Sequence, residues 1–141
     1  MKNSITILLL CFVTLTSAVN KNKDLHAPAI QFETLSHDFG TLKQDEITED
    51  FVFRFKNTGN APLVINEVEK PCGCTHPEWS KEPVMPGKTG EIKVRFSAKG
   101  QPKGVFRKTL NVYSNIGTER TPILMIKGNI VKGKVQQPKQ N

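Results

Sequence analysis

The sequence holds few of the residues on which most chemical functions depend. Its 141 residues include three cysteines, three histidines, one tryptophan and one tyrosine. No segment shows the 3.6-residue period of an amphipathic helix, so no helix is available to carry a phosphate-binding loop. Gly87-Lys88-Thr89 resembles the end of such a loop, but Glu82 stands where the earlier glycine is required. We interpret it as a β-turn and expect no catalytic residues in this chain.

The shortage of aromatic residues also bears on nucleic acids. Bases of single strands stack on aromatic side chains, and one Trp and one Tyr supply few such platforms. We therefore expect no nucleic-acid partner. Trp79, the one tryptophan, follows the cysteines closely, and we interpret it as an anchor for that segment rather than as a ligand-stacking platform.

The N-terminus has the pattern of a secretory leader. Lys2 is followed by an apolar run over residues 5–15 and then by Thr16-Ser17-Ala18, a small-residue cleavage site. The run is about half of the roughly 20 residues that a spanning helix needs. We predict a signal peptide over residues 1–18, in preference to an uncleaved anchor or a lipid on Cys11, and no later membrane span. Export to a periplasmic or extracellular space would permit disulfides.

The chain is basic, with 20 Lys and Arg against 13 Asp and Glu and a formal charge of +7, or about +6 once Lys2 leaves with the leader. A positive charge can mark an anionic partner such as a lipid surface or a polysaccharide. The cations alternate with apolar residues, however, as Lys93 and Arg95 do, which is the pattern of solvated outward positions. We favour a lysine-rich surface of a soluble domain.

Alternation of period two dominates the rest of the sequence. Phe51, Phe53 and Phe55 share one parity, and burial of each ring contributes on the order of 1.5–3 kcal/mol before entropy. About seven short segments of this kind, separated by turns rich in Gly, Pro and Asn, predict an all-β fold. The expected strands lie at residues 30–33, 37–40, 51–56, 63–68, 92–96, 106–114 and 122–126. We predict one immunoglobulin-like β-sandwich over residues 29–131, after a linker at 19–28 and before a disordered basic tail at 132–141.

Several motifs together carry a family resemblance. They are residues 37–40 (HDFG), 51–59 (FVFRFKNTG), 62–65 (PLVI), 72–75 (CGCT) and 86–92 (PGKTGEI). In this order they resemble the exported bacterial domain of unknown function number fifteen seventy-three, which is similar to Hydin-like immunoglobulin domains. The resemblance implies an immunoglobulin-like sandwich in an exported, non-enzymatic protein. It implies no substrate and no catalytic residue.

Cys72-Gly73-Cys74 is the segment of the sequence that could support the widest range of chemistry. In an extended strand the two Cα atoms would lie nearly 7 Å apart, beyond the usual range for a disulfide, but Gly73 allows a kink that closes the gap. A local disulfide is one alternative. Soft-metal binding is another, with Cys72, Cys74 and His76 as ligands for copper or zinc and Met85 as a further donor. Thiol-redox chemistry of the same pair is the third.

Two functional hypotheses follow. The first is an exported, non-enzymatic interaction or structural module of the cell envelope, without a cofactor, whose partner is an unidentified protein or envelope component. Strand addition at a sheet edge is one way in which such folds bind. The second is a soft-metal or thiol-redox protein that acts through Cys72, Cys74 and His76. His37 beside Asp38 we interpret as a strand-edge pair rather than a catalytic dyad.

Overall fold

The structure is a computed structural model, which describes residues 26–117 and 122–133. The predicted signal peptide therefore lies outside the described residues, as does most of the predicted linker and tail. The described part contains eight strands and no helix: β1 (Ile30–Phe32), β2 (Ser36–Lys43), β3 (Phe51–Asn57), β4 (Ile65–Glu69), β5 (Thr75–Trp79), β6 (Thr89–Phe96), β7 (Gly104–Ser114) and β8 (Ile123–Val131). None of the described residues belongs to a helix long and apolar enough to cross a membrane.

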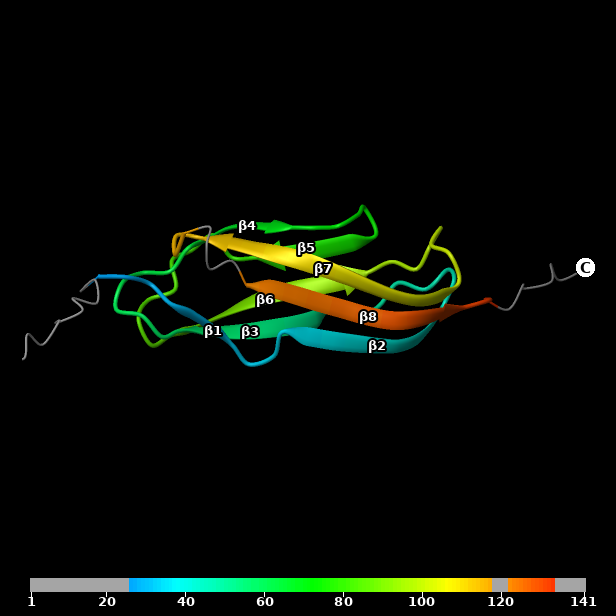
Figure 1. Cartoon of the computed structure of the whole chain (residues 1–141), viewed down its shortest axis with the longest axis horizontal. Helices are drawn as coiled ribbons and strands as arrows, with labels where there is room; N and C mark the ends of the chain where they lie inside the picture. Colours follow the sequence, from blue (N-terminus) through cyan, green and yellow to red (C-terminus); the bar gives the residue numbers. More distant parts are fainter. Residues whose placement is uncertain (1–25, 118–121, 134–141) are drawn as a thin grey trace, which may run out of the picture.

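The strands form two layers (Figure 1). One sheet has the order β1-β3-β6-β5 and the other the order β2-β8-β7-β4, here called the β3–β6 sheet and the β7–β8 sheet. All pairs are antiparallel except β2 with β8, which are parallel. The chain begins in the β3–β6 sheet with β1 and crosses to the β7–β8 sheet for β2. This arrangement confirms the predicted all-β, immunoglobulin-like sandwich.

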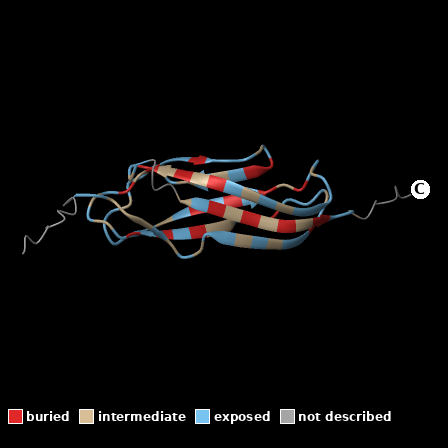
Figure 2. Cartoon of the chain, viewed as in Figure 1, coloured by how far each residue is buried: buried red, intermediate tan, exposed pale blue. Residues whose placement is uncertain are grey.

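The core lies between the layers, where buried positions alternate along the central strands (Figure 2). Phe53 and Phe55 are buried and Phe51 is partly buried on the same side of β3, as the alternation predicts. Phe96 stacks on Phe106 from the opposite sheet, with 4.2 Å between ring centroids. Side chains from both sheets thus interdigitate, and a one-residue shift in the register of one of these strands would turn its core side chains toward solvent.

Three strand predictions need correction. β5 was not expected, because Pro77 interrupts its sequence; proline is tolerated there since β5 is an edge strand. β2 does not end at a glycine turn. It continues to Lys43 through a register shift, in which Gly40 adopts a φ of 69°. β4 begins at Ile65 rather than at residue 63, because Leu63 bridges to Val84 instead of joining β7.

A buried amide ties the turns at one end of the sandwich together. Asn57 is fully buried, and its Nδ2 group donates hydrogen bonds of 2.8 Å to the carbonyls of both Ala61 and Val84. Its Oδ1 atom accepts hydrogen bonds from the backbone N–H groups of Gly59 and Ala29. One side chain therefore fixes the turn after β3, the segment before β1 and the loop before β6.

Candidate functional site

The cysteine segment forms the corner at which the chain passes from one sheet to the other. β4 belongs to the β7–β8 sheet and β5 to the β3–β6 sheet, and residues 70–74 connect them. The Thr75 N–H donates to the Cys72 carbonyl at 3.3 Å, which closes a tight turn around Gly73. The turn brings the Cα atoms of Cys72 and Cys74 to 5.2 Å, and the two sulfurs are joined in a disulfide.

The disulfide is anchored to the core rather than displayed on the surface. Cys74 is buried and Cys72 is partly buried. The fully buried Thr75 hydroxyl lies 3.6 Å from the Cys72 Sγ atom and 3.8 Å from the Cys74 Sγ atom, within range of weak sulfur hydrogen bonds. The Cys74 carbonyl accepts a 2.8 Å hydrogen bond from the Ser97 N–H group. This arrangement suits a fixed structural corner.

The other predicted metal ligands do not converge on the sulfurs. We expected His76 on the same side as Cys74, but His76 is exposed while Cys74 is buried, because Cys74 belongs to the turn and not to β5. Met85 follows Val84, which pairs with Leu63 at the opposite end of β4 from the cysteines. The five residues of β4, at about 3.3 Å per residue, therefore separate the end of the sheet near Met85 from the cysteine corner by roughly 17 Å.

The sulfurs also have no free thiolate to offer, since both belong to the disulfide. Within residues 26–117 and 122–133, no three His, Cys, Asp or Glu side chains gather closely enough to hold a metal ion. In this oxidised form the residues do not fit a copper or zinc site, and no step through a metal is derived.

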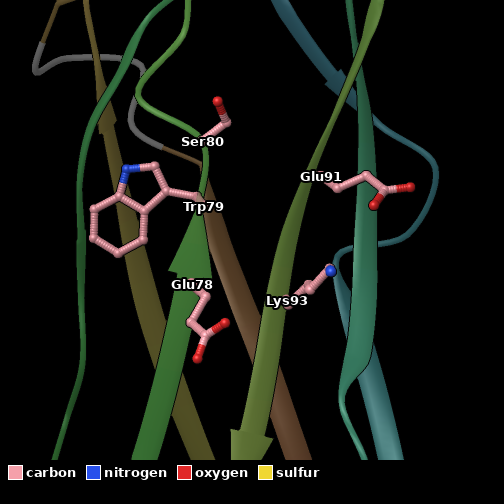
Figure 3. Close-up of a pocket in the computed structure, with 5 residues that line it drawn as sticks. All are labelled: Glu78, Trp79, Ser80, Glu91 and Lys93. Atoms are coloured by element: carbon pink, nitrogen blue, oxygen red, sulfur yellow. The ribbon is translucent and has the colours of Figure 1, made fainter.

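A shallow hollow of about 450 Å³ lies on the outer side of the β3–β6 sheet, at the end of β5 (Figure 3). Glu78 and Lys93 are cross-strand neighbours at its floor, so their opposite charges lie side by side. Glu91, further along, is 3.1 Å from the Arg54 guanidinium. Each carboxylate therefore has a cationic neighbour, and the hollow holds no isolated acid–base pair.

Trp79 lies at the rim of this hollow and points away from Glu91 and Lys93 in Figure 3. Its Nε1–H group donates to the Ile65 carbonyl on β4 at 3.2 Å, and the Lys81 ammonium sits 4.1 Å from the ring centroid. Lys81 also donates to the Asn66 carbonyl at 2.9 Å. Trp79 thus links β5 to β4 at the ends of these strands that lie away from the cysteine corner, so it anchors the two strands to each other and not the cysteine turn itself.

His37 and Asp38 point to opposite sides of β2, so they form no dyad. His37 packs between the sheets, and burial lowers its pKa while the charge of Asp38 opposes that shift. Asp38 is on the outer side, where it accepts a 2.8 Å hydrogen bond from the Gly40 N–H and lies 3.5 Å from the Lys127 ammonium. These contacts lower the pKa of Asp38.

The polar cluster of Glu69, Asn111 and Tyr113 was not predicted from the sequence. Glu69 accepts hydrogen bonds from Asn111 at 2.9 Å and from the Tyr113 hydroxyl at 3.1 Å. The two donors lower the pKa of Glu69, and the carboxylate raises the pKa of Tyr113. No sequence signal could reveal this cluster, because Glu69 is more than forty residues from Asn111 and Tyr113 and meets them only through the register of β4 with β7.

Comparison with known families identifies the domain. Residues 30–130 match the family described as "Protein of unknown function (DUF1573)". The chain belongs to this family. The match confirms the resemblance seen in the motifs and extends it over all eight strands. No curated protein matches the sequence.

Solved structures show a similar fold. A protein of unknown function from Porphyromonas gingivalis W83 superposes with a TM-score of 0.64 at 14% identity, over 74% of this chain and 48% of that one. This chain thus spans about half the length of the Porphyromonas protein. The ASH/PapD-like domain 7 of human CEP192 gives a TM-score of 0.59 at 9% identity, over 74% of this chain and 87% of that one. At these identities the likeness concerns the fold alone.

A third structure, the secreted serine protease VesC from Vibrio cholerae, matches 74% of this chain but only 23% of its own length, with a TM-score of 0.52 and 11% identity. The match is therefore to one part of VesC. It gives no reason to transfer protease chemistry to this domain, because fold likeness does not carry function.

Proposed function

We propose that this protein is an exported, non-enzymatic module of the cell envelope that binds a partner protein through one outer face of its sandwich. The observation that carries the proposal is a chemical difference between the two outer faces. Both are the solvent-facing sides of four-stranded sheets.

The outer face of the β3–β6 sheet has the composition of a solvated surface. Its exposed positions are mostly charged, and they include Arg54, Lys56, Glu78, Glu91, Lys93 and Arg95. Several of them neutralise one another or a neighbour: Arg54 pairs with Glu91 at 3.1 Å, and Arg95 pairs with Asp50 at 2.9 Å. This face is well satisfied by water and by its own ion pairs.

The outer face of the β7–β8 sheet differs. Near the end of the β7–β8 pairing, Thr109 lies opposite Met125 and Asn111 lies opposite Ile123. Ile123 has 54% of its surface exposed. Tyr113 follows on β7, held by its hydrogen bond to Glu69. We call Thr109, Asn111, Tyr113, Ile123 and Met125 the apolar face.

Protein interfaces are enriched in Tyr and Met and depleted in Lys, Glu and Asp relative to other surfaces. The apolar face contains Tyr113 and Met125, which the charged face lacks, and it is bordered by Glu67 and Glu69 of β4. The disulfide and the leader pattern support export, because disulfides persist in oxidising compartments. The charge-compensated groups in the hollow beside Trp79 support a binding role rather than catalysis.

The test uses two matched variants, Ile123→Glu on the apolar face and His76→Glu on the charged face, both at exposed strand positions. The full chain is expressed with a C-terminal tag, and partners are cross-linked in the envelope fraction. We expect wild type and H76E to capture the same partner and I123E to lose it. Retention of that partner by I123E would contradict the role of the face. Wild type confined to the cytoplasm with an intact leader would contradict export.

A further inference from the structure

One half of β7 has a neighbour on one side only. β8 pairs with β7 from Gly104 to Asn111 without a shift in register. On the other side, β4 pairs with β7 only from Asn111 to Ser114. Figure 1 shows β4 beside only that end of the longer strand. Residues 104–110 therefore form an uncovered edge within the β7–β8 sheet, which we call the β7 edge.

Hydrogen bonds beyond the β7 edge establish which backbone groups face outward. The Val112 N–H donates to the Pro122 carbonyl on the β8 side, and the Asn115 N–H donates to the Val64 carbonyl on the β4 side. Backbone groups of successive residues in an antiparallel strand point to alternate sides. The N–H and C=O groups of Val105, Arg107 and Thr109 therefore point away from β8. No strand of the described chain pairs with them there.

Three of the four edge strands, β2, β4 and β5, are protected in ways that the β7 edge is not, and the fourth, β1, has only three residues. On β4, the Ile65 and Asn66 carbonyls are capped by the side chains of Trp79 and Lys81. β5 contains Pro77, and β2 is interrupted by the bulge at Gly40. Prolines, bulges and capping groups are the usual means of preventing a strand from joining an edge. The β7 edge contains no proline and no bulge.

A hollow of about 260 Å³ follows the β7 edge. Its lining includes Val105 and Arg107, which face outward from the sheet, and Phe106 and Lys108, which face the interior. Residues of both parities line it, together with Ile130 of β8 and the turn at residues 101–103, so the hollow lies at the start of β7 and reaches both faces of the strand. Val105 is 86% exposed, the highest value among the large apolar residues of the described chain.

The charges along this hollow have one sign. Lys103, Arg107 and Lys108 contribute to its lining, and no acidic residue does. Arg107 also lies directly opposite Lys127 on β8, an unfavourable pairing of like charges within the isolated sheet. Lys127 pairs with Asp38, whereas Arg107 pairs with no acidic residue of the described chain. A ligand carboxylate beside Arg107 would relieve this repulsion.

We propose that the β7 edge binds an extended acidic segment of a partner protein, which adds to the β7–β8 sheet as a further strand. The backbone groups of Val105, Arg107 and Thr109 would pair with the segment, its carboxylates would meet Lys103, Arg107 and Lys108, and an apolar side chain would cover Val105. A second copy of β7 is a poor occupant, because it would bring these cations together. The proposal goes beyond the proposed function, because the β7 edge is a second surface that shares only Thr109 with the apolar face.

The experiment measures binding of a fluorescent ten-residue peptide, in which Glu alternates with Val or Thr, to the mature full-length protein by anisotropy. Two matched peptides accompany it: one with Lys in place of Glu, and one with the same sequence but N-methylated at alternate residues. N-methylation removes the backbone donors while the charges stay. We expect saturable binding of the first peptide only.

Variants locate the site. Arg107→Glu replaces an attractive charge with a repulsive one and should weaken binding by about tenfold. The matched control Lys93→Glu lies on the charged face and should change little. Amide hydrogen exchange gives a direct signature, because the bound peptide should protect the N–H groups of Val105, Arg107 and Thr109. The intervening even-numbered amides already face β8 and should show little further change.

Three outcomes would overturn the inference. They are absence of saturable binding, equal binding of the N-methylated peptide, and stronger binding of an anionic polysaccharide or an anionic vesicle with no protection of the three amides. None of these outcomes would contradict the proposed function. That function is tested by partner capture with I123E and H76E, and it stands if capture succeeds while the peptide fails.

Discussion

The imidazole ring of His37 on β2 lies parallel to the ring of Phe51 on β3, with 3.6 Å between their centroids and 10° between their planes. The two strands belong to opposite sheets, so this stack closes the side of the sandwich. Phe39 meets the same imidazole edge-on at 4.6 Å. A titratable group is thus built into an aromatic contact that holds the layers together.

This stack makes stability depend on pH. Partial burial lowers the pKa of His37 in the folded protein below the ordinary 6.5. The unfolded chain therefore binds more protons between the two pKa values, and the free energy of unfolding must rise with pH through that window. We expect wild type to lose stability as the pH falls from 7.5 to 5.5. Urea denaturation at several pH values measures the loss.

The matched variants for this measurement are His37→Phe, which keeps a ring in the stack, and His76→Gln, which removes an exposed histidine. We expect H37F to flatten the pH dependence over this window and H76Q to leave it as in wild type. Asp38 stays ionised throughout, because its contacts lower its pKa further below the neutral range. An unchanged slope in H37F would show that another group is responsible.

The second prediction concerns the thiols. The mature oxidised protein, unfolded in denaturant, should contain no titratable thiol and should bind no Cu(I), since Cys72 and Cys74 form a disulfide. Closing a three-residue loop contributes about 1.6 kcal/mol by chain entropy. Reduction should lower the free energy of unfolding by that amount. The Cys72→Ser/Cys74→Ser variant should match the reduced protein and should not respond to reductant.

Stoichiometric Cu(I) binding by the oxidised protein would contradict this prediction and revive the soft-metal hypothesis. Binding that appears only after reduction, and that C72S/C74S lacks, would instead show that the metal competes with the disulfide. Equal stability of oxidised and reduced protein would show that the hydrogen bonds of Thr75 and Ser97 hold the corner by themselves.

The sequence could predict the fold because its strongest signals are local. Alternation in β3, β6 and β7 reports which side chains face the core, and the same residues are buried in the structure. The alternation is weak in β5, where Pro77 sits between polar residues and pairing with β6 decides the conformation. A strand whose conformation is set by pairing with its neighbour has only a weak pattern in its own sequence.

The candidate sites were harder to predict from the sequence, because they too depend on contacts between distant segments. Cys72 and Cys74 are separated only by Gly73, so a local disulfide could be considered from spacing. The opposite exposure of Cys74 and His76 could not be predicted from the sequence, because it depends on whether Cys74 lies in a strand or in a turn. The β7 edge requires the length of β4 relative to β7, which only the tertiary structure supplies.

The third prediction tests the contact between Gly90 and Phe55, which are cross-strand partners on β6 and β3. A Cβ atom added to Gly90 would meet the Phe55 ring, at 2.8 Å from Cε2. Phe55 is almost fully buried and its ring packs against that of Phe32, with 5.4 Å between the centroids. We expect Gly90→Ala to lower the free energy of unfolding by about 1–3 kcal/mol, measured by urea denaturation.

A double-mutant cycle separates this clash from a general effect of replacing glycine. In a Phe55→Leu background the smaller side chain leaves room, so Gly90→Ala should cost clearly less than in wild type. Gly73→Ala is the control, because a Cβ atom there meets nothing within 4 Å. Strict additivity of the two substitutions would mean that the ring and the glycine do not interact.

The fourth prediction concerns the buried amide of Asn57. Replacement by Ala would leave the Ala61 carbonyl and the Gly59 N–H group without the partner they now have, while the Val84 carbonyl would keep only its bond from the Leu63 N–H. Each buried polar group left unsatisfied costs about 1–3 kcal/mol. We expect Asn57→Ala to lower the free energy of unfolding by about 3 kcal/mol or more.

Asn57→Asp makes the test sharper because it preserves the shape. A carboxylate cannot donate to the two carbonyls at 2.8 Å, so N57D should be destabilised although the number of heavy atoms is unchanged. Asn66→Ala, at an exposed position of β4, should stay within about 0.5 kcal/mol of wild type. If N57D unfolds at the same denaturant concentration as wild type, the amide is not what holds the three segments together. The rigidity of that end must then come from the Leu63–Val84 bridge and from the Gly87 N–H bond to the Asn57 carbonyl.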